Sequence, residues 1–436
     1  MTIGASERLE VAVIGAGWAG CAAAVEATKL GHQVTVFEAS RTPGGRARRF
    51  DVVHDGQNLA LDNGQHILIG AYSETLKLIA ELGVDVPASF LRMPLTMQFP
   101  EGGGLVLPQL PAPFDALAGI VRARGWSIAD KWSLLKAATL WQLRQFKCPA
   151  AQTVADLCRS ISPRVIATLI EPLCVSALNT PADQASGQVF LRVLQDSMFA
   201  VSGGSNLLLP RADLSALLPD AALGWLRNQG GHVQLGCRVG SITPVANKAW
   251  QLTGANEAPL GQFDSVILAC PPQEAARLAR STTLPCDAWL ALAGDLRFEA
   301  ITTVYANAPG TQLARPMLAL ACSERYPAQF VFDRGQLGGP PGLLAFVVSA
   351  SQGDAATLAS QTAAQAVRQL NIQKLEVLQT VVEKRATFAC TPGLKRPGAV
   401  IAPGLLACGD YIDGPYPATL EGAVRSGLQV ARLLDK

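Results

Sequence analysis

The sequence predicts an α/β fold in which parallel strands alternate with helices, together with a second part of mixed α and β structure. Three observations predict it. A short apolar run at residues 11–14 precedes a glycine-rich turn and a helical pattern, a second run follows at 34–37, and further runs recur at 263–270 and 404–410. Such runs, bounded by turn residues, are typical of strands buried on both faces. The 436 residues are enough for two or three domains.

The turn after the first strand carries the pattern Gly-x-Gly-x-x-Gly, with Gly15, Gly17 and Gly20. Gly15 permits a tight turn, Gly17 lets a pyrophosphate approach the backbone, and Gly20 lets the helix at residues 21–30 pack closely on the sheet. The free amides at the helix N-terminus attract phosphate oxygens. The pattern predicts a dinucleotide-binding unit of the Rossmann type, and the alternative is a glycine-rich turn without a ligand.

The second strand ends at Glu38, 18 residues beyond Gly20. A carboxylate there accepts hydrogen bonds from both ribose hydroxyls and disfavours a 2′-phosphate. The next segment, Arg-Thr-Pro-Gly-Gly-Arg at 41–46, ends in Gly45 and Arg46, which would approach and neutralise a pyrophosphate. This second loop favours FAD over a nicotinamide dinucleotide. The alternative is a surface loop with two scattered arginines.

Composition excludes several classes of protein. The formal net charge of +2 argues against nucleic-acid binding. Four separated histidines and ten cysteines without a Cys-x-x-Cys pair argue against a metal site, and we expect the cysteines to be small core residues in a reducing cytoplasm. The first strand begins so near the first Met that we expect no signal peptide.

The chain is 49% apolar and only 16% charged, although it contains no charge-free apolar run of about 18 residues that would span a membrane. The usual charged share is about 25%. The low value indicates a large interior, an apolar ligand cavity or a face that contacts lipid.

The middle of the chain divides into turn-rich and helical segments. Residues 91–114 are rich in proline and glycine and are expected to form short strands and turns, and residues 115–200 are mostly helical in pattern. Tryptophans and leucines alternate with arginines and lysines over 115–147, which fits a helix on a membrane surface. An ordinary amphipathic helix packed on the core also fits, so both interpretations stay open.

The α/β pattern returns after Pro210. The sequence predicts a helix at 214–226, strands at 232–235, 238–242, 250–252 and 263–270, and no readable motif over 273–384. A last strand at 404–410 and a last helix at 419–434 complete the chain.

The last strand ends in Gly409-Asp410, where open α/β sheets bind ligands. Asp410 would accept a hydrogen bond from a ribityl hydroxyl. The amides of Gly422 and Ala423, at the start of the last helix, would face the flavin ring and stabilise negative charge on it. The alternative is a Gly-Asp turn before a packed helix.

Taken together, GAGWAG, Glu38, RTPGGR, ACGDYIDG and TLEGAVRSG resemble the superfamily of FAD-dependent amine oxidases and phytoene desaturases, and GCRVGSI (236–242) and VILACPP (266–272) extend the likeness through the middle of the chain. The resemblance implies FAD as cofactor, with backbone bonds from the strand of Val239 to the adenine. It implies a discontinuous FAD-binding domain over 1–85, 205–272 and 385–436. An interleaved substrate domain with a helical, membrane-facing part would occupy 86–204 and 273–384.

Within that superfamily, LDNGQHILIGAY (61–72), EPLCVSALNTP (171–181) and LPRADLSALLP (209–219) resemble the bacterial hydroxysqualene dehydroxylases of hopanoid synthesis. The resemblance implies reduction of the isoprenoid hydroxysqualene to squalene, with electrons from an external donor that the sequence does not identify. Localisation would be cytoplasmic, with peripheral contact on the membrane.

Such a reaction needs an acid to protonate the departing hydroxyl and an apolar tunnel to shelter the allylic cation. His66 is the first candidate, because its Asn-Gly-Gln-His turn, with Gly64, is expected near the isoalloxazine. Asp62 and Glu171 are weaker candidates. The alternative for His66 is a side chain that only holds the turn.

Three other functions fit parts of the pattern. A flavin amine oxidase would need aromatic walls at the flavin, and aromatics are only 6% of this chain. A phytoene- or carotenoid-type desaturase would run similar chemistry in the oxidative direction. A prenyl-lipid escort protein would bind lipid without flavin, and the intact RTPGGR and Gly409-Asp410 argue against it.

Overall fold

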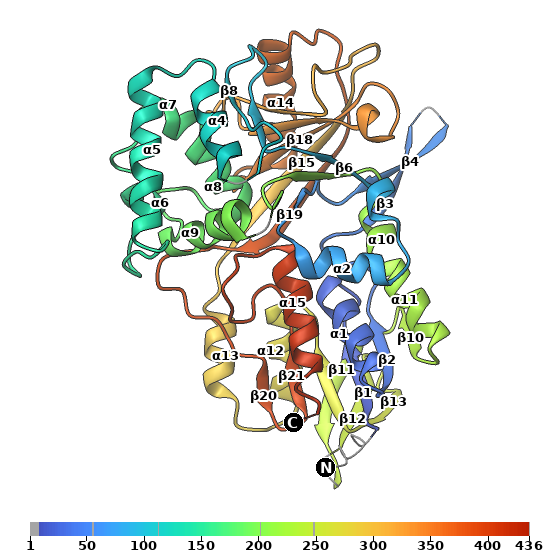
Figure 1. Cartoon of the computed structure of the whole chain (residues 1–436). Coiled ribbons are helices and arrows are strands. Elements are labelled where there is room, and N and C mark those ends of the chain that lie inside the picture. The colour runs from blue at the N-terminus through green and yellow to red at the C-terminus, as the bar shows by residue number, and fades with distance from the viewer. Residues whose placement is uncertain (1–7, 55, 112, 201, 247–248, 436) are drawn as a thin grey trace.

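The computed structural model describes residues 8–54, 56–111, 113–200, 202–246 and 249–435, so the first residues, where we expect no signal peptide, lie outside it. The described chain has two parts that lie one above the other in Figure 1. The lower part is built on a largely parallel sheet, and the upper part combines an antiparallel sheet with a group of helices. The predicted fold class is confirmed.

Within the described ranges the lower sheet has six strands in the order β10-β2-β1-β14-β21-β20. All neighbours pair in parallel except β20, which runs antiparallel to β21 at one edge. The central strands are almost fully buried, as expected for a sheet covered on both faces. The strands are β1 (Glu10–Ile14), β2 (Gln33–Glu38), β10 (His232–Leu235), β14 (Ser265–Leu268), β20 (Val400–Ala402) and β21 (Leu405–Ala407).

Two helices from opposite ends of the chain, α1 (Trp18–Lys29) and α15 (Leu420–Ala431), pack against each other beside this sheet. A Cβ at Gly427 would lie 2.2 Å from the carbonyl oxygen of Ala19, so the helices approach through a glycine. Helix α1 begins three residues before the predicted start, because the amide of Cys21 already bonds the Gly17 carbonyl oxygen at 2.9 Å.

The helix predicted at 214–226 is two helices, α10 (Leu214–Leu217) and α11 (Pro219–Asn228). Leu218 between them has φ of −140°, because the ring of Pro219 disfavours helical geometry in the residue before it. The strand predicted at 263–270 is also divided, between the end of β13 (Pro259–Phe263) and β14. Strand β13 completes a three-stranded antiparallel sheet with β11 (Val239–Pro244) and β12 (Trp250–Gly254).

The upper part contains a five-stranded antiparallel sheet in the order β16-β17-β18-β15-β19, with helix α14 (Ala355–Leu370) packed on it. It arises from the region in which the sequence shows no motif. Its strands are β15 (Phe298–Asn307), β16 (Met317–Ala319), β17 (Phe330–Asp333), β18 (Leu343–Ser349) and β19 (Glu376–Phe388), and a 3-10 turn, η4 (Arg334–Leu337), follows β17.

Shorter elements join the two parts, and the strands and turns expected over 91–114 are among them. The smaller sheets are β3 (Arg49–His54) with β4 (Gln57–Asp62), β5 (Leu68–Ile69) and β6 (Phe90–Met93) on either side of β9 (Leu207–Pro210), and β7 (Thr96–Gln98) with β8 (Gly104–Val106). The short helices here are α2 (Ser73–Glu81) and α3 (Val86–Ser89).

A group of helices covers one side of the upper part (Figure 1). None of the helices in the described ranges is both long and apolar enough to cross a bilayer. The group comprises α4 (Phe114–Arg122), α5 (Ile128–Leu143), α6 (Val154–Leu157), α7 (Pro163–Val165), α8 (Glu171–Leu178) and α9 (Gly187–Gln195), with the π-helical turns η1 (Ile166–Ile170) and η2 (Asp196–Ala200).

The six strands of the lower sheet all come from the segments that the sequence assigns to FAD binding. Helices α12 (Pro272–Ser281) and α13 (Asp287–Gly294), assigned to the substrate domain, lie beside the lower sheet in Figure 1. The hydroxyl of Ser281 accepts the amide of Ile242 in β11 at 2.9 Å. We therefore propose to keep the two-domain division and to move this boundary to about residue 295.

Candidate active site

Around the turn between β1 and α1, the positions of Gly15 and Gly20 have no room for a side chain. Gly15 has φ of +117°, and a Cβ there would lie 2.4 Å from the carbonyl oxygen of Ala269 at the end of β14. A Cβ at Gly20 would lie 1.9 Å from the carbonyl oxygen of Gly15. Helix α1 begins at Gly17 without a side-chain cap, so its first amides are available to a ligand.

The second glycine loop lies against the first. The amide of Gly44 donates to the carbonyl oxygen of Ala16 at 2.8 Å, and Gly17 and Gly44 form an isolated parallel bridge. Gly45 has φ of +61°, and a Cβ there would lie 3.3 Å from the Cα of Gly17. Two backbone segments that are distant in the sequence therefore form one cradle, which a Cβ at Gly45 would narrow.

Glu38 lies at the carboxyl end of β2, beside this cradle. Its carboxylate accepts the amides of Ala16 at 2.7 Å and Ser40 at 2.8 Å, so it is oriented before any ribose is bound. The strand of Val239 starts nearby, because the amide of Cys237 donates to the Glu38 carbonyl oxygen at 2.9 Å. The Val239 carbonyl oxygen accepts a hydrogen bond from Arg277 at 2.9 Å.

Arg46 and Asp410 form an ion pair with each other. The sequence predicts that Arg46 neutralises a pyrophosphate and that Asp410 accepts a hydrogen bond from a ribityl hydroxyl. An Arg46 Nη2 donates to Asp410 Oδ1 at 2.6 Å, and Nη1 donates to the carbonyl oxygen of Ala386 at 2.6 Å. Burial opposes the charge on Arg46, but the Asp410 carboxylate outweighs it and the pKa of Arg46 is raised. The pair joins the second glycine loop to the end of β21, so both ends of the chain meet at the cradle.

The C-terminal turn contains an unpartnered polar atom. Gly409 has φ of +155°, its amide donates to the Ser426 hydroxyl at 3.1 Å, and a Cβ there would lie 2.7 Å from the ring of Tyr411. Tyr411 is 2% exposed, and its hydroxyl has no hydrogen-bond partner within the described chain. Burial raises the pKa of that hydroxyl well above its usual value, so it is a neutral donor beside Asp410.

The first amides of α15 form hydrogen bonds with Thr419, the residue that caps the helix. The hydroxyl of Thr419 accepts the Gly422 amide at 3.0 Å, and the Thr419 carbonyl oxygen accepts the Ala423 amide at 3.0 Å. These amides, expected to face a flavin, are therefore already engaged. The sequence analysis did not single out Glu421, which is 1% exposed and accepts bonds from the amide and hydroxyl of Thr75 in α2. The only sign of this buried residue in the sequence is a carboxylate close to the cap of the last helix.

The Asn-Gly-Gln-His turn lies next to the second glycine loop, because the side chain of Asn63 accepts the amide of Arg48 at 3.1 Å. The ring of His66 is half-buried, and its Nδ1 lies 2.8 Å from the carbonyl oxygen of Gly64. Since a carbonyl oxygen only accepts, Nδ1 carries the proton and Nε2 is the free nitrogen. Burial lowers the pKa of His66, with a smaller contribution from the charge of Arg46.

Asp62 occupies a different environment. It is 5% exposed, its carboxylate accepts the amide of Leu214 at 2.9 Å, and its carbonyl oxygen accepts the hydroxyl of Tyr305 at 2.8 Å. Burial raises the pKa of Asp62 to about 6. These contacts place Asp62 at the start of α10, where it ties that helix to β15.

Glu171 lies at the junction of η1 and α8, and its side chain is exposed. Burial of part of the side chain and the nearby Asp183 raise the pKa of Glu171. No hydrogen bond between described residues joins it to the turn of His66. The three predicted acids therefore stand in three separate environments, and only His66 lies beside the glycine cradle.

An apolar cavity of about 90 Å³ lies within the helical group, and its position could not be predicted from the sequence. Only apolar side chains line it in the described chain, and they come from β8, α4, α5, α8, α9 and the π-helical turns, including Leu105, Ile120, Trp141, Leu169 and Leu194. The helical repeat of apolar residues over 115–200 was a signal for burial, not for a cavity. π-Helical turns often occur at functional sites.

One wall of the cavity reaches the C-terminal turn. Leu194 lines the cavity, and Arg192 on the same helix lies over the ring of Tyr416 at 5.7 Å. Arg425 of α15 lies over the same ring at 5.4 Å. Helix α9, which supplies Leu194 to the cavity, therefore also contacts the C-terminal segment at Tyr416.

The cradle, oriented acid and buried tyrosine fit a dinucleotide, and the second glycine loop fits FAD. The combination with an apolar cavity defines a flavin-dependent oxidoreductase. Residues 18–435 match the family described as flavin containing amine oxidoreductase, and the chain belongs to that family. Its cofactor is FAD.

Two relatives and one solved structure give the likeness in detail. The chain is 30% identical to a hydroxysqualene dehydroxylase of Rhodopseudomonas palustris, over 97% of this chain and 98% of that protein. It is 26% identical to a hydroxysqualene dehydroxylase of Sinorhizobium fredii, over 97% of each. An oxidoreductase structure from Methanosarcina mazei, 19% identical, superposes with a TM-score of 0.71 over 98% of this chain and all of that one, which shows the shared fold.

Proposed function

We propose that this oxidoreductase reduces hydroxysqualene to squalene. The observation that carries the proposal is the cavity of about 90 Å³ in the helical group, whose walls are apolar and would hold part of a hydrocarbon chain. A hydrocarbon chain has no polar groups that need hydrogen-bond partners, so apolar walls can bind it without leaving a polar group unsatisfied. The same walls would keep water away from a cationic carbon. The likeness to hydroxysqualene dehydroxylases over the full length supports the same substrate.

The overall change replaces a carbon–oxygen bond by a carbon–hydrogen bond. The hydroxyl leaves as water after it accepts a proton, and the carbon accepts a hydride. Reduced FAD supplies that hydride when bound, and an external donor must restore two electrons after each turnover. The chain itself has to bind the lipid, exclude water and deliver the proton.

His66 is the proposed proton donor, through Nε2. Its Nδ1 is engaged with Gly64, so only Nε2 can exchange a proton with a substrate. The lowered pKa means that the cationic form is a minor species at neutral pH and a reactive acid when formed. Asp62 and Glu171 stay as weaker proposals, since Asp62 is bonded to Leu214 and Glu171 is exposed.

We also propose that the enzyme works in the cytoplasm, with the helical group in peripheral contact with the membrane. Helix α5 shows both features expected over residues 115–147: one set of apolar side chains packs on the core, and another is exposed. Leu134 and Trp141 are buried against the core, whereas Ile128, Trp132 and Leu143 are 86%, 67% and 75% exposed. Large exposed apolar side chains next to lysine and arginine favour contact with a lipid surface.

A single turnover without oxygen tests the proposed reaction. The purified protein is photoreduced and mixed with hydroxysqualene, and the absorbance of oxidised flavin is followed while squalene is assayed. Recovery of the oxidised flavin together with squalene supports a reductive dehydroxylase. A flavin that stays reduced rejects this substrate and favours a desaturase. A purified protein without flavin would reject both and leave a lipid escort.

A further inference from the structure

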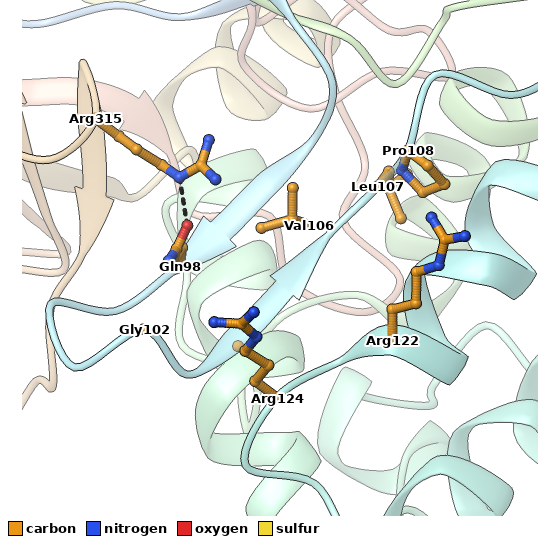
Figure 2. Close-up of a pocket in the computed structure, with 9 residues that line it drawn as sticks. Gln98, Gly102, Val106, Leu107, Pro108, Arg122, Arg124 and Arg315 are labelled. Atoms are coloured by element: carbon orange, nitrogen blue, oxygen red, sulfur yellow. Dashed lines mark hydrogen bonds between the residues drawn. The ribbon is translucent and has the colours of Figure 1, made fainter.

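A second pocket, of about 320 Å³, opens on the other side of β8 from the apolar cavity. Figure 2 shows Val106 of β8 between arginine side chains from separate segments. Arg122 belongs to the last turn of α4, Arg124 to the segment after it, and Arg315 to the loop before β16. The described lining residues include no acid, so the pocket is strongly cationic.

The arginines are positioned but not neutralised. Arg315 donates from Nε to the side-chain oxygen of Gln98. The backbone of Arg124 exchanges two hydrogen bonds with Gly104, at 3.0 and 3.1 Å. The guanidinium groups of Arg122 and Arg124 form no hydrogen bond or ion pair with the described residues. Like charges around one pocket repel each other until an anion binds, and guanidinium groups match phosphate oxygens in pairs.

The pocket adjoins the exposed apolar face of the helical group. Alternation along β8 turns Leu105 toward the apolar cavity and Val106 toward the arginines. On α4 the exposed side chains of Phe114, Leu117 and Val121 recur at helical spacing, and Val121 directly precedes Arg122. A cationic pocket therefore borders an apolar surface, which is the arrangement of a phospholipid headgroup above its acyl chains.

We propose that this pocket binds the phosphate of an anionic phospholipid headgroup while the outer face of α4 and α5 contacts the bilayer. The proposal rests on the proposed lipid function and deepens it, because it identifies what holds the enzyme on the membrane. A soluble phosphate would account for the arginines, but it would leave Phe114, Leu117, Ile128 and Trp132 exposed for no purpose. The shared wall at Leu107 then keeps the apolar cavity next to the docked face.

Cosedimentation with vesicles tests the site, using the FAD-loaded full chain. The vesicles are phosphatidylcholine alone or phosphatidylcholine mixed with phosphatidylglycerol. The combined variant Arg122→Gln, Arg124→Gln and Arg315→Gln should lose roughly a hundredfold in binding to the mixed vesicles, from the contribution of each cationic side chain near an anionic surface. The matched control, Arg227→Gln, Arg280→Gln and Arg368→Gln, removes the same charge from exposed positions outside the pocket. It should change binding less than about threefold.

Three results would overturn the proposal. Equal losses in both triple variants would mean diffuse attraction of a cationic protein. Unchanged binding in the pocket variant would exclude the site. Binding of inorganic phosphate that the pocket variant loses, without any effect on vesicles, would make it a site for a soluble phosphate. Flavin content and thermal midpoint show that each variant is folded, and single turnover in detergent separates failure of docking from failure of the proposed reaction.

Discussion

The cofactor cradle and the helical group are built in opposite ways. In the cradle, Gly15, Gly20 and Gly45 leave no room for side chains, and backbone amides face the ligand. In the helical group, side chains from seven elements surround an apolar volume, and no polar side chain lines it within the described residues. The shape of the cradle therefore depends on close backbone contacts at a few residues, whereas the cavity depends on the packing of many side chains.

The largest effect is expected where contact is closest. Gly20→Val should abolish FAD binding and destabilise the fold, because even a Cβ would lie 1.9 Å from the Gly15 carbonyl oxygen. Gly224→Ala in α11 is the matched control, since nothing lies within 4 Å of its Cβ position and alanine favours a helix. Flavin content after purification and the thermal midpoint measure both. Normal flavin content in Gly20→Val would show that the glycine cradle does not bind FAD.

The proton donor should give the next largest effect. His66→Asn removes the titrating ring, and we expect a loss of about 10²-fold or more in the single-turnover rate. In the wild type the rate should fall as pH rises through the folded pKa, below 6.5, because only the cation donates from Nε2. The unfolded chain binds more protons in the window up to 6.5, so this residue's contribution to stability rises with pH there. His232→Asn, at an exposed strand position, should keep the wild-type pH profile.

Filling the cavity should separate the lipid site from the cofactor. Ala138 lines the cavity and Thr139 beside it is exposed, so Ala138→Phe and Thr139→Phe form a matched pair on α5. We expect Ala138→Phe to lower turnover of hydroxysqualene about tenfold, from lost volume and overpacking, with flavin content unchanged. Equal turnover in the two variants would mean that the lipid binds elsewhere.

The pair that joins the two ends of the chain should have a moderate effect. Arg46→Gln leaves the Asp410 carboxylate buried without its partner, which should cost about 2 kcal/mol of unfolding free energy after allowance for solvent at the exposed arginine. Adding Asp410→Asn should recover part of that loss. Urea unfolding of the FAD-loaded wild type, both single variants and the double variant gives the four unfolding free energies. Strictly additive losses of unfolding free energy would show that the two side chains act separately.

Replacement of Asp62 should give an effect of opposite sign. Its folded pKa of about 6 lies above the ordinary 3.8, so the folded state binds the extra proton between these values. Stability from this group is therefore lost as pH rises through about 6, by roughly 2–3 kcal/mol at most. Asp62→Asn keeps an acceptor for Leu214 and should be at least as stable as the wild type near neutral pH. Urea unfolding at acidic and neutral pH should show a flatter dependence in the variant.

Much of the fold was predictable because its signals are local. Gly15, Gly17 and Glu38 needed only the spacing of one strand, turn and helix. The break at Pro219 was also local but was overlooked, although a proline restricts the residue before it. The five-stranded sheet was not predictable, since its order depends on pairing between segments distant in the chain.

The α/β class, the two glycine loops and FAD as cofactor could be predicted from the sequence, because the strand, turn and helix that carry these motifs follow one another along the chain. Only the tertiary structure decided that Arg46 bonds Asp410, that Asp62 holds Leu214, and that β8 separates an apolar cavity from a cationic pocket. The physical reason is that a charged or apolar side chain bonds whatever the fold brings within a few ångströms, and that neighbour lies anywhere in the sequence.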